Sequence, residues 1–405
     1  MAQRSRTTPR SPSRRSEEGG RLIVSARSFQ GELQIPRRHV VVFCDDAFGP
    51  QSERWIDLIP DGRHRILPVF DGGFDAAHPA CRPRVEAFFD AHSTRFDRAS
   101  TLVVPGGEMA KNDPQVVESV LASIHAENIC RQSFVAIFGG GAVLDAVGFA
   151  ASIAHRGVKV LRFPTTTLAQ DDAGIGVKNG VNHHNEKNWR GVFSVPTAVV
   201  NDFSLLATLS ARDWRSGFSE AVKVALLKDA GEFERLEQDA EAIARRSEPE
   251  SQRAIVRSAE LHWQHIVEGG DPFEDEIARP LDYGHWSAHR LERLTQGELK
   301  HGEAVAIGLG IDAALAVELG RSTPDFQRRV LSVLHKFGFT LDHPQLDDPS
   351  ELFVGIEQFR AHLGGALVLT LVAEPGVSFD IHDADFASIS GAIERHRSMV
   401  RTLQV

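Results

Sequence analysis

Short apolar runs, each followed by a glycine-rich or polar turn, recur through the first half of this sequence. They cover Val40–Cys44, Leu102–Val104, Phe134–Phe138 and Val158–Phe163, and helical stretches such as 114–127 lie between them. Continuous apolar runs are typical of strands that are buried on both faces of a sheet. Their alternation with helices predicts an α/β region with a parallel sheet and helices on both faces. Ligands of such sheets bind at the carboxyl ends of the strands.

The second half of the sequence is dominated by helical patterns. Periodicity predicts helices over 211–228, 231–246, 250–269, 284–294, 301–319 and 325–337. A linker-like break at 344–349 is followed by two short segments, 366–373 and 377–381, that predict a β-hairpin. We therefore expect a disordered Arg- and Ser-rich tail over 1–25, an α/β domain over 26–202 and a mainly α-helical domain over 203–405.

The composition is that of an ordinary globular protein, with 42% hydrophobic and 25% charged residues among 405. A net charge of -10 argues against a general nucleic-acid binder. No apolar run is long enough to span a membrane, and the tail lacks the apolar segment of a secretory signal. Three scattered cysteines without CxxC spacing fit a reducing cytoplasm, so we expect a cytoplasmic protein.

A glutamate and three histidines carry the clearest sign of metal chemistry. His285 and His289 are four residues apart and share one face of a helix, while His301 opens the next predicted helix. Glu220, His285 and His301 would give a divalent metal three protein ligands and leave positions open for substrate. His289 could then reach a substrate held on the metal. Ordinary helix histidines, and a helix-face ion pair between Glu220 and Lys223, are the alternatives.

A triple-glycine turn, Gly139–Gly141, ends one apolar run and opens a helix that contains Asp145. Glycines allow the backbone to approach a pyrophosphate, and the helix N-terminus adds free N–H groups and a positive dipole end. The alternative is a tight turn without a ligand.

A second glycine turn, Gly106–Gly107, precedes Glu108 and Lys111, which could reach adenosine hydroxyls. Asp45 ends the first apolar run and is placed to bind a ribose. Solvated loop charges are the alternative for each of these side chains.

Polar residues are densest between Pro164 and Asn188, directly after a buried strand. This density suggests an anion-binding active-site loop, in which lysines bind phosphate as mobile point charges. A long surface loop is the alternative. Arg156, just before the preceding strand, could hold a phosphate in its own or in a neighbouring subunit. The polar residues of the segment include Thr165, Thr166, Asp171, Asp172, Lys178, Asn182, Lys187 and Asn188.

Together these motifs resemble those of the sugar phosphate cyclase superfamily, whose best known member is 3-dehydroquinate synthase. The similar segments lie in the family's order between about residues 36 and 375: PGGEMAKN, GGGAVLDAVGF, HRGVKVLRFPTTTLAQDDAGIGVKNGVN, EKN, SEAVK, LDYGH and HGEAVAIG. The resemblance implies a two-domain fold, a homodimer, a tightly held NAD and one divalent metal, zinc or cobalt.

The resemblance also implies roles for individual residues, carried over by position. The implied metal ligands are Glu220, His285 and His301. The implied NAD contacts are Asp45, Glu108, Lys111, Gly140, Gly141, Asp145, Thr165 and Thr166. The implied substrate or catalytic residues are Asp172, Lys178, Lys187, Asn188, Lys223 and His289. Arg156 matches a phosphate-binding arginine that is donated across the dimer.

Several positions depart from the 3-dehydroquinate synthase pattern. Asp282 replaces an asparagine, and His362 stands where a lysine is expected. Another substrate-binding lysine is missing, since no lysine occurs between Lys228 and Lys300, and His262 or Gln264 occupies its neighbourhood. The family's arginine is displaced as well: Ala278 holds its position and Arg279 follows. The gain of negative charge and loss of positive charge disfavour a substrate carboxylate and suit hydroxyl groups.

The Asp282 and His362 exchanges look like those of cyclases acting on sedoheptulose 7-phosphate, such as 2-epi-5-epi-valiolone synthase, although His289 is kept as in 3-dehydroquinate synthase. The segments DPFE, RPLDYGHWSAH and DDAGIGVKNG look most like the Ebo-cluster branch of these cyclases. We expect an NAD- and metal-dependent lyase that converts a heptulose 7-phosphate, with sedoheptulose 7-phosphate favoured, to a carbocycle by phosphate elimination and intramolecular aldol closure.

Two alternatives remain for the function. One is a 3-dehydroquinate synthase acting on 3-deoxy-arabino-heptulosonate 7-phosphate. The other is a metal-dependent polyol dehydrogenase, a class that shares the triple-glycine turn and the architecture.

Overall fold

The computed structural model describes residues 28–31, 35–184, 186–273, 279–362 and 364–403. The tail predicted over 1–25 lies outside the described residues, and so does Ala278. Residues 38–405 group into one compact unit, to which the following architecture belongs.

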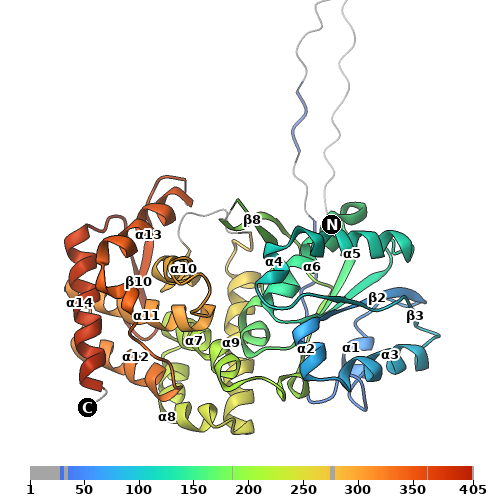
Figure 1. Cartoon of the computed structure of the whole chain (residues 1–405), viewed down its shortest axis with the longest axis horizontal. Coiled ribbons are helices and arrows are strands. Elements are labelled where there is room, and N and C mark those ends of the chain that lie inside the picture. Colours follow the sequence, from blue (N-terminus) through green and yellow to red (C-terminus); the bar gives the residue numbers. More distant parts are fainter. Residues whose placement is uncertain (1–27, 32–34, 185, 274–278, 363, 404–405) are drawn as a thin grey trace, which may run out of the picture. The chain divides into compact units, whose positions relative to one another are not determined.

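A parallel sheet forms the first part of this unit (Figure 1). The strand order is β1-β9-β6-β5-β2-β3, and β4 also pairs with β2. The predicted α/β architecture is confirmed, and the four expected apolar runs are all strands. The bounds are β1 Val41–Cys44, β2 His64–Asp71, β3 Phe96–Arg98, β4 Leu102–Val104, β5 Phe134–Gly139, β6 Lys159–Pro164 and β9 Ala198–Asp202.

The sequence did not predict β2, which contains Pro68, a residue that normally argues against a central strand. The structure shows why Pro68 is tolerated. The Ile66 carbonyl accepts a hydrogen bond from Ala99 N–H, so Pro68, two residues on, faces the same side of β2. On that side β2 pairs with β3 through 64–66 and with β4 through 69–71, and Pro68 lies in the gap. Its missing N–H therefore interrupts no ladder.

Both faces of the sheet are covered, which explains the continuous apolar runs. In β5, Val135 and Ile137 belong to the same apolar cluster as α5 (Pro114–Ala126) and α6 (Gly141–Ile153). Phe134, Ala136 and Phe138 alternate with them and belong to the cluster of α1 (Glu53–Ile56) and α3 (Cys81–Ala91). A strand packed on both faces has no polar side to show in its sequence.

The connections of β5 and β2, which are neighbours, leave in opposite directions. The chain passes from β5 through α6 to β6 on one side, and from β2 through α3 to β3 on the other. Such a switch point is where open parallel sheets bind ligands. The triple-glycine turn lies there, beside Asp71 at the end of β2, since a Cβ on Gly139 would be 3.3 Å from the Asp71 Cβ.

The polar segment Pro164–Asn188 is not the loop that the sequence predicts. It contains the π-helix η2 (Ala169–Ala173) and the antiparallel hairpin of β7 (Lys178–His183) and β8 (Glu186–Phe193). Arg162, buried in β6, holds the start of the hairpin by donating to the Gly174 and Gly176 carbonyls at 2.9 and 2.6 Å and to Asn179 Oδ1 at 2.8 Å. The polar residues of the segment Pro164–Asn188 therefore belong to an ordered structure that packs on α6.

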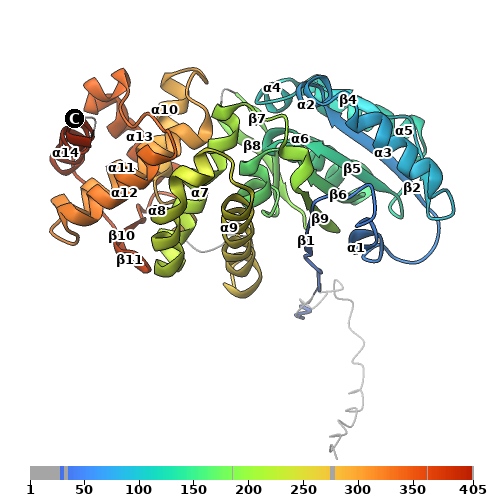
Figure 2. The ribbon, with the colours of Figure 1, turned by 90° about the horizontal axis from the view of Figure 1, so that it is seen from below.

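The second part of the unit is helical, as predicted. The helix α11 packs against α7, α10, α12 and α14 (Figure 2) and is buried on all sides from Gly302 to Ala316. The predicted break at 344–349 contains the 3-10 helix η5 (Pro344–Asp347) and the first residue of α13, and the sequence missed α13 and α14. The bounds are α7 Ala211–Lys228, α8 Ala230–Ala244, α9 Glu248–Glu268, α10 His285–Leu294, α11 His301–Glu318, α12 Pro324–Lys336, α13 Pro349–His362, β10 Leu369–Glu374, β11 Val377–Ile381 and α14 Phe386–Leu403.

The helical apolar core begins at Leu206. A domain boundary at residue 203 stays a prediction, because residues 38–405 group as one unit. No helix within the described ranges is both long and apolar enough to cross a membrane.

Candidate active site

The predicted metal ligands come together from three helices. Glu220 lies in α7, His285 opens α10 and His301 opens α11. The Nε2 atoms of His285 and His301 lie 3.5 and 3.4 Å from Glu220 Oε1. One donor atom from each residue lies within 4.8 Å of the others, which is the spacing of ligands around a single ion.

The charge at Glu220 fits a bound cation. The side chain is buried, and neither oxygen has a hydrogen-bond partner in the described part of the chain, although Lys223 Nζ lies 2.5 Å from Oε2. Burial alone would raise the pKa of Glu220, but Lys223, His285 and His301 hold it well below its usual range. A buried carboxylate is costly unless cations compensate it. Lys223 pairs with Oε2, and Oε1 is the oxygen that faces both histidines. This donor set of one carboxylate and two imidazoles suits zinc or cobalt.

The turn before α10 orients His285. Gly284 has a φ of +79°, and His285 Nδ1 lies 3.1 Å from the Tyr283 carbonyl, which leaves Nε2 facing Glu220. Asp312, buried in α11, accepts hydrogen bonds from Gly284 N–H at 2.7 Å and Trp286 Nε1–H at 2.6 Å. Burial raises the pKa of Asp312 to about 7. The turn that precedes His285 is therefore hydrogen-bonded to the buried Asp312 of α11.

His289 lies beside the metal ligands, as its spacing predicts. Its ring is exposed, and its centroid is 5.4 Å from that of His285 and 6.1 Å from that of His301. A second set of potential ligands consists of His289, Glu292 and His301. Glu292 was not among the expected residues, although its spacing of seven from His285 and three from His289 places it on the same helix face.

Carboxylates surround Lys223, which is buried in α7. Burial opposes its charge, yet Glu220 and Asp172 raise the pKa of Lys223, and Asp282 adds to the effect. The structure thus brings Asp172 and Asp282 close to Lys223 and Glu220.

The structure also places His262, which the sequence marked as one of two residues near the missing lysine. His262 Nδ1, from α9, lies 2.9 Å from Asp172 Oδ1. An imidazole therefore reaches the polar residues around the metal centre from α9.

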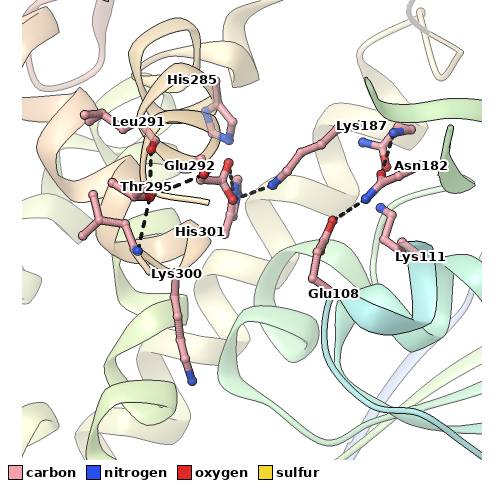
Figure 3. A network of polar contacts seen from close by, with 12 residues as sticks. Glu108, Lys111, Asn182, Lys187, His285, Leu291, Glu292, Thr295, Lys300 and His301 are labelled. Carbon is pink, nitrogen blue, oxygen red and sulfur yellow. Dashed lines mark hydrogen bonds and ion pairs between the residues drawn. The ribbon is translucent and has the colours of Figure 1, made fainter. Parts of the chain in front are cut away.

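The β7–β8 hairpin carries three of the expected substrate residues, and one of them reaches α10, the helix that begins with His285. Lys187 Nζ lies 2.7 Å from Glu292 Oε1 (Figure 3). The Asn188 backbone N–H donates to Asn182 Oδ1 at 2.9 Å, and the Asn188 φ is +56°. Lys178 is exposed at the start of β7.

Arg156 and His362 are placed differently from the other expected residues. Arg156 is exposed in a short 3-10 turn at the carboxyl end of α6, with a φ of +63°. The glycine turn opens the same helix, and 13 residues of α-helix span about 20 Å, so Arg156 lies far from that turn. His362 ends α13, and its side chain lies outside what the structure describes.

All of the expected NAD contacts except Asp45 lie around the triple-glycine turn. Gly140 is the N-cap of α6, and a Cβ there would be 3.2 Å from Thr166 Cγ2. Thr165 N–H donates to the Gly139 carbonyl at 3.0 Å. A Cβ on Gly141 would be 2.9 Å from the Ala173 Cβ, so the chain passes too closely for a larger residue.

Charged residues next to this turn pair with one another. Lys111 Nζ lies 2.8 Å from Asp145 Oδ2; burial opposes the charge of Lys111, but Asp145 raises its pKa. Glu108 Oε1 accepts from Asn182 Nδ2 at 2.7 Å (Figure 3). Asp45 lies apart, exposed at the end of edge strand β1, three strands from β5 in the sheet order.

Sequence reasoning missed Arg162, Glu292 and Asp312 as parts of the site, and it marked Asn182 only as one polar residue of the segment Pro164–Asn188. A signal existed for two of them. Arg162 is a charged residue inside an apolar strand, and Glu292 shares the spacing of the histidines. The partners of Asn182 and Asp312 are distant in sequence, so only the fold reveals them.

Two family descriptions match the chain consecutively. The 3-dehydroquinate synthase N-terminal family matches residues 101–216, and the 3-dehydroquinate synthase C-terminal family matches 217–355.

Individual proteins give the same picture. A 2-epi-5-epi-valiolone synthase of Streptomyces glaucescens is 35% identical over 316 residues, which cover 72% of this chain and 80% of that protein. A 3-dehydroquinate synthase of Cereibacter sphaeroides is 37% identical over 246 residues, which cover 60% of this chain and 65% of that protein.

A solved structure is similar over almost the whole chain. The 2-epi-5-epi-valiolone synthase of Streptomyces hygroscopicus, determined with NAD⁺ and Zn²⁺ bound, superposes with a TM-score of 0.82 at 26% identity. The match covers 91% of this chain and 99% of that one. The protein belongs to the 3-dehydroquinate synthase-like family of sugar phosphate cyclases.

Proposed function

We propose that this protein is an NAD- and divalent-metal-dependent lyase that converts sedoheptulose 7-phosphate to a carbocycle, with loss of phosphate and intramolecular aldol closure. The observation that carries the choice of substrate is the charge around Lys223. Glu220, Asp172 and Asp282 all lie near it, so its single positive charge is already compensated. Glu220 would give its charge to the metal, which leaves Asp172 and Asp282 against the single charge of Lys223. A substrate carboxylate would be repelled by these two side chains, whereas hydroxyl groups could hydrogen-bond to them.

The cofactors have separate places. Glu220, His285 and His301 would hold the metal, which supplies a Lewis acid for a carbinol oxygen. The glycine turn, with Thr165 and Thr166, would hold NAD, which accepts and returns a hydride. The relative solved with NAD⁺ and Zn²⁺ supports this pair of cofactors.

The chain's own residues bind and orient the substrate. Lys223 and Asp172 would hold hydroxyl groups near the metal, and His262 would fix the orientation of Asp172 through the 2.9 Å contact. Lys178, Asn188 and His289 would bind the phosphate, with Lys187 in the same hairpin.

Arg156 would complete the phosphate site from a neighbouring subunit of a homodimer. Its position at the far end of α6 from the glycine turn supports action in another subunit rather than in its own. Its left-handed backbone, shared with His155 at φ +51°, is the kind of strain that concentrates at functional sites.

One alternative has an observation in its favour. His289 lies against His285 and His301, as a residue shared with 3-dehydroquinate synthases would, and such enzymes are among the relatives. That activity would require a place for the carboxylate of 3-deoxy-arabino-heptulosonate 7-phosphate. Placement in the Ebo-cluster branch stays a prediction.

The experiment is to incubate the protein with NAD, Zn²⁺ or Co²⁺ and each of the two sugar phosphates, and to measure phosphate release. We expect phosphate and a carbocyclic product, identified by mass and NMR, from sedoheptulose 7-phosphate, with no net NADH. Preference for the carboxylated sugar would support 3-dehydroquinate synthase. NADH accumulation without phosphate release would indicate a dehydrogenase.

A matched variant tests the charge argument directly. Asp282→Asn removes one carboxylate from beside Lys223 while keeping the size of the side chain. We expect it to shift the ratio of kcat/KM values towards the carboxylated sugar, and an unchanged ratio would contradict the role given to Asp282.

A further inference from the structure

Glu292 has a different partner on each of its two oxygens. It lies near the carboxyl end of α10, and its side chain is only 6% exposed. Oε1 accepts from Lys187 Nζ at 2.7 Å, and Oε2 lies 3.4 Å from His301 Nδ1 (Figure 3). One buried carboxylate thus contacts both the β7–β8 hairpin and a candidate metal ligand.

The contact with His301 determines which ring nitrogen faces the metal centre. A carboxylate accepts hydrogen bonds, so Nδ1 carries the proton on the Glu292 side. Nε2 is then directed at Glu220, 3.4 Å from its Oε1. Carboxylates that hold metal-binding histidines in this way fix the tautomer and the ring orientation and make the imidazole a better ligand.

The backbone around His301 supports the same arrangement. Thr295 Oγ1 donates to the Leu291 carbonyl at 2.8 Å and accepts from Leu299 N–H at 3.4 Å, which ties the loop after α10 to its last turn. Glu303 Oε2 accepts from Lys300 N–H at 3.0 Å and caps α11 immediately before His301. These bonds hold the backbone before His301 in place. The rotation of the His301 ring is then the freedom that the contact with Glu292 restrains.

The contact with Lys187 joins the β7–β8 hairpin to α10. Lys187 lies in β8, and its side chain is 30% exposed. A buried carboxylate that loses its cation is strongly destabilised, so the ion pair draws the hairpin towards α10. The position of Lys187 and the orientation of His301 therefore depend on one side chain.

We propose that Glu292 is a positioning residue that couples the metal centre to the substrate-binding hairpin. It orients His301 for the metal through one oxygen and anchors Lys187 through the other. This inference rests on the proposed function only in that the site holds a divalent metal.

The test is the affinity of metal-free full-length protein for Co²⁺ and Zn²⁺, measured by competition with a chromophoric chelator. We expect Glu292→Gln to weaken binding by about 10- to 100-fold, the usual loss when a carboxylate behind a metal-binding histidine is removed. The visible spectrum of the bound Co²⁺ should also change, because the His301 ring is less constrained. A role in folding alone would alter neither quantity in protein that remains folded.

Three further variants make the result specific. Glu351, in α13, pairs at 2.5 Å with Arg290 of α10, the helix that also carries Glu292. Glu351→Gln removes this carboxylate and should leave metal affinity unchanged. Lys187→Met should raise the KM for the sugar phosphate and leave metal affinity within a few-fold, because His301 keeps its partner. Glu292→Asp keeps the charge and should restore part of the affinity, which also covers the case that Glu292→Gln does not fold.

The outcomes separate the two proposals. If the unmodified protein binds neither metal, the proposed function fails. If it binds metal and Glu292→Gln binds equally well with the same Co²⁺ spectrum, the positioning role is overturned. Equal losses of metal affinity in Glu292→Gln and Glu351→Gln would likewise overturn it. The loss would then come from a disturbance of α10 and not from the contact between Glu292 and His301.

Discussion

The turns at the ends of β5 and β6 and the metal centre on α7, α10 and α11 are built from different kinds of structure. At the turns, the proposed NAD site is formed by backbone: Gly140 caps α6, Gly141 opens it, and Thr165 is held through its N–H. At the proposed metal site, Glu220, His285 and His301 come from separate helices and would bind the ion through their side chains. We therefore expect NAD binding to be weakened by side-chain atoms added at the turn, and metal binding to be lost when a ligand side chain is removed.

The strongest test of this contrast is removal of a metal ligand. His285→Ala should abolish stoichiometric metal binding and lower kcat by at least about a thousandfold, since the metal supplies several kcal/mol of transition-state stabilisation. Metal content and phosphate release are the measurements, and NAD binding should be preserved because the turn is separate.

His289→Ala is the matched control for that variant. It should retain the metal, because the assigned site uses Glu220, His285 and His301. If His289→Ala loses the metal and His285→Ala keeps it, the ion lies instead among His289, Glu292 and His301.

The opposite test adds one carbon at the turn. In Gly141→Ala the new Cβ would be 2.9 Å from the Ala173 Cβ, so α6 and η2 must separate. Overpacking of this kind costs about 1–3 kcal/mol, which should appear as a lower free energy of unfolding and weaker NAD binding in a fluorescence titration.

Gly176→Ala provides the comparison, since a Cβ there meets its nearest atom at 3.6 Å. It should change NAD affinity little, and both variants should bind metal normally. Loss of metal in Gly141→Ala would show that the two regions are not independent.

A smaller effect concerns pH and the core beneath the metal centre. Burial raises the pKa of Asp312 from its ordinary value of 3.8 to about 7. Between these values the folded protein keeps a proton that the unfolded chain has lost, so this group's contribution to stability decreases as pH rises. From pH 5 to 7 the decrease is about 2 kcal/mol.

Asp312→Asn should remove that decrease. Urea unfolding of the metal-free protein at pH 5 and pH 7 gives the free energy of unfolding at each pH. The slope of this free energy with pH should be less negative in the variant than in the wild type. Identical slopes would mean that Asp312 is ionised in the folded protein. Gly141→Ala keeps Asp312, so its stability should decrease between pH 5 and pH 7 as much as that of the wild type.

The sequence alone determined the parts of the protein whose signals are local. Apolar runs gave the strands buried on both faces, and helical periodicity gave most of the helices. The motifs at strand ends, and the spacing of His285, His289 and His301, singled out candidate residues because parallel strands place their carboxyl ends at one edge and a helix places i and i+4 on one face.

The tertiary structure decided everything that depends on contacts between distant segments. It converted the polar segment Pro164–Asn188 from an expected loop into a π-helix and a hairpin, held by Arg162. It accommodated Pro68 in a strand, and it identified His262, Glu292 and Asp312 by their partners. A side chain's role as a support depends on which atoms lie within hydrogen-bonding distance, and packing brings those atoms together from positions that no sequence spacing relates.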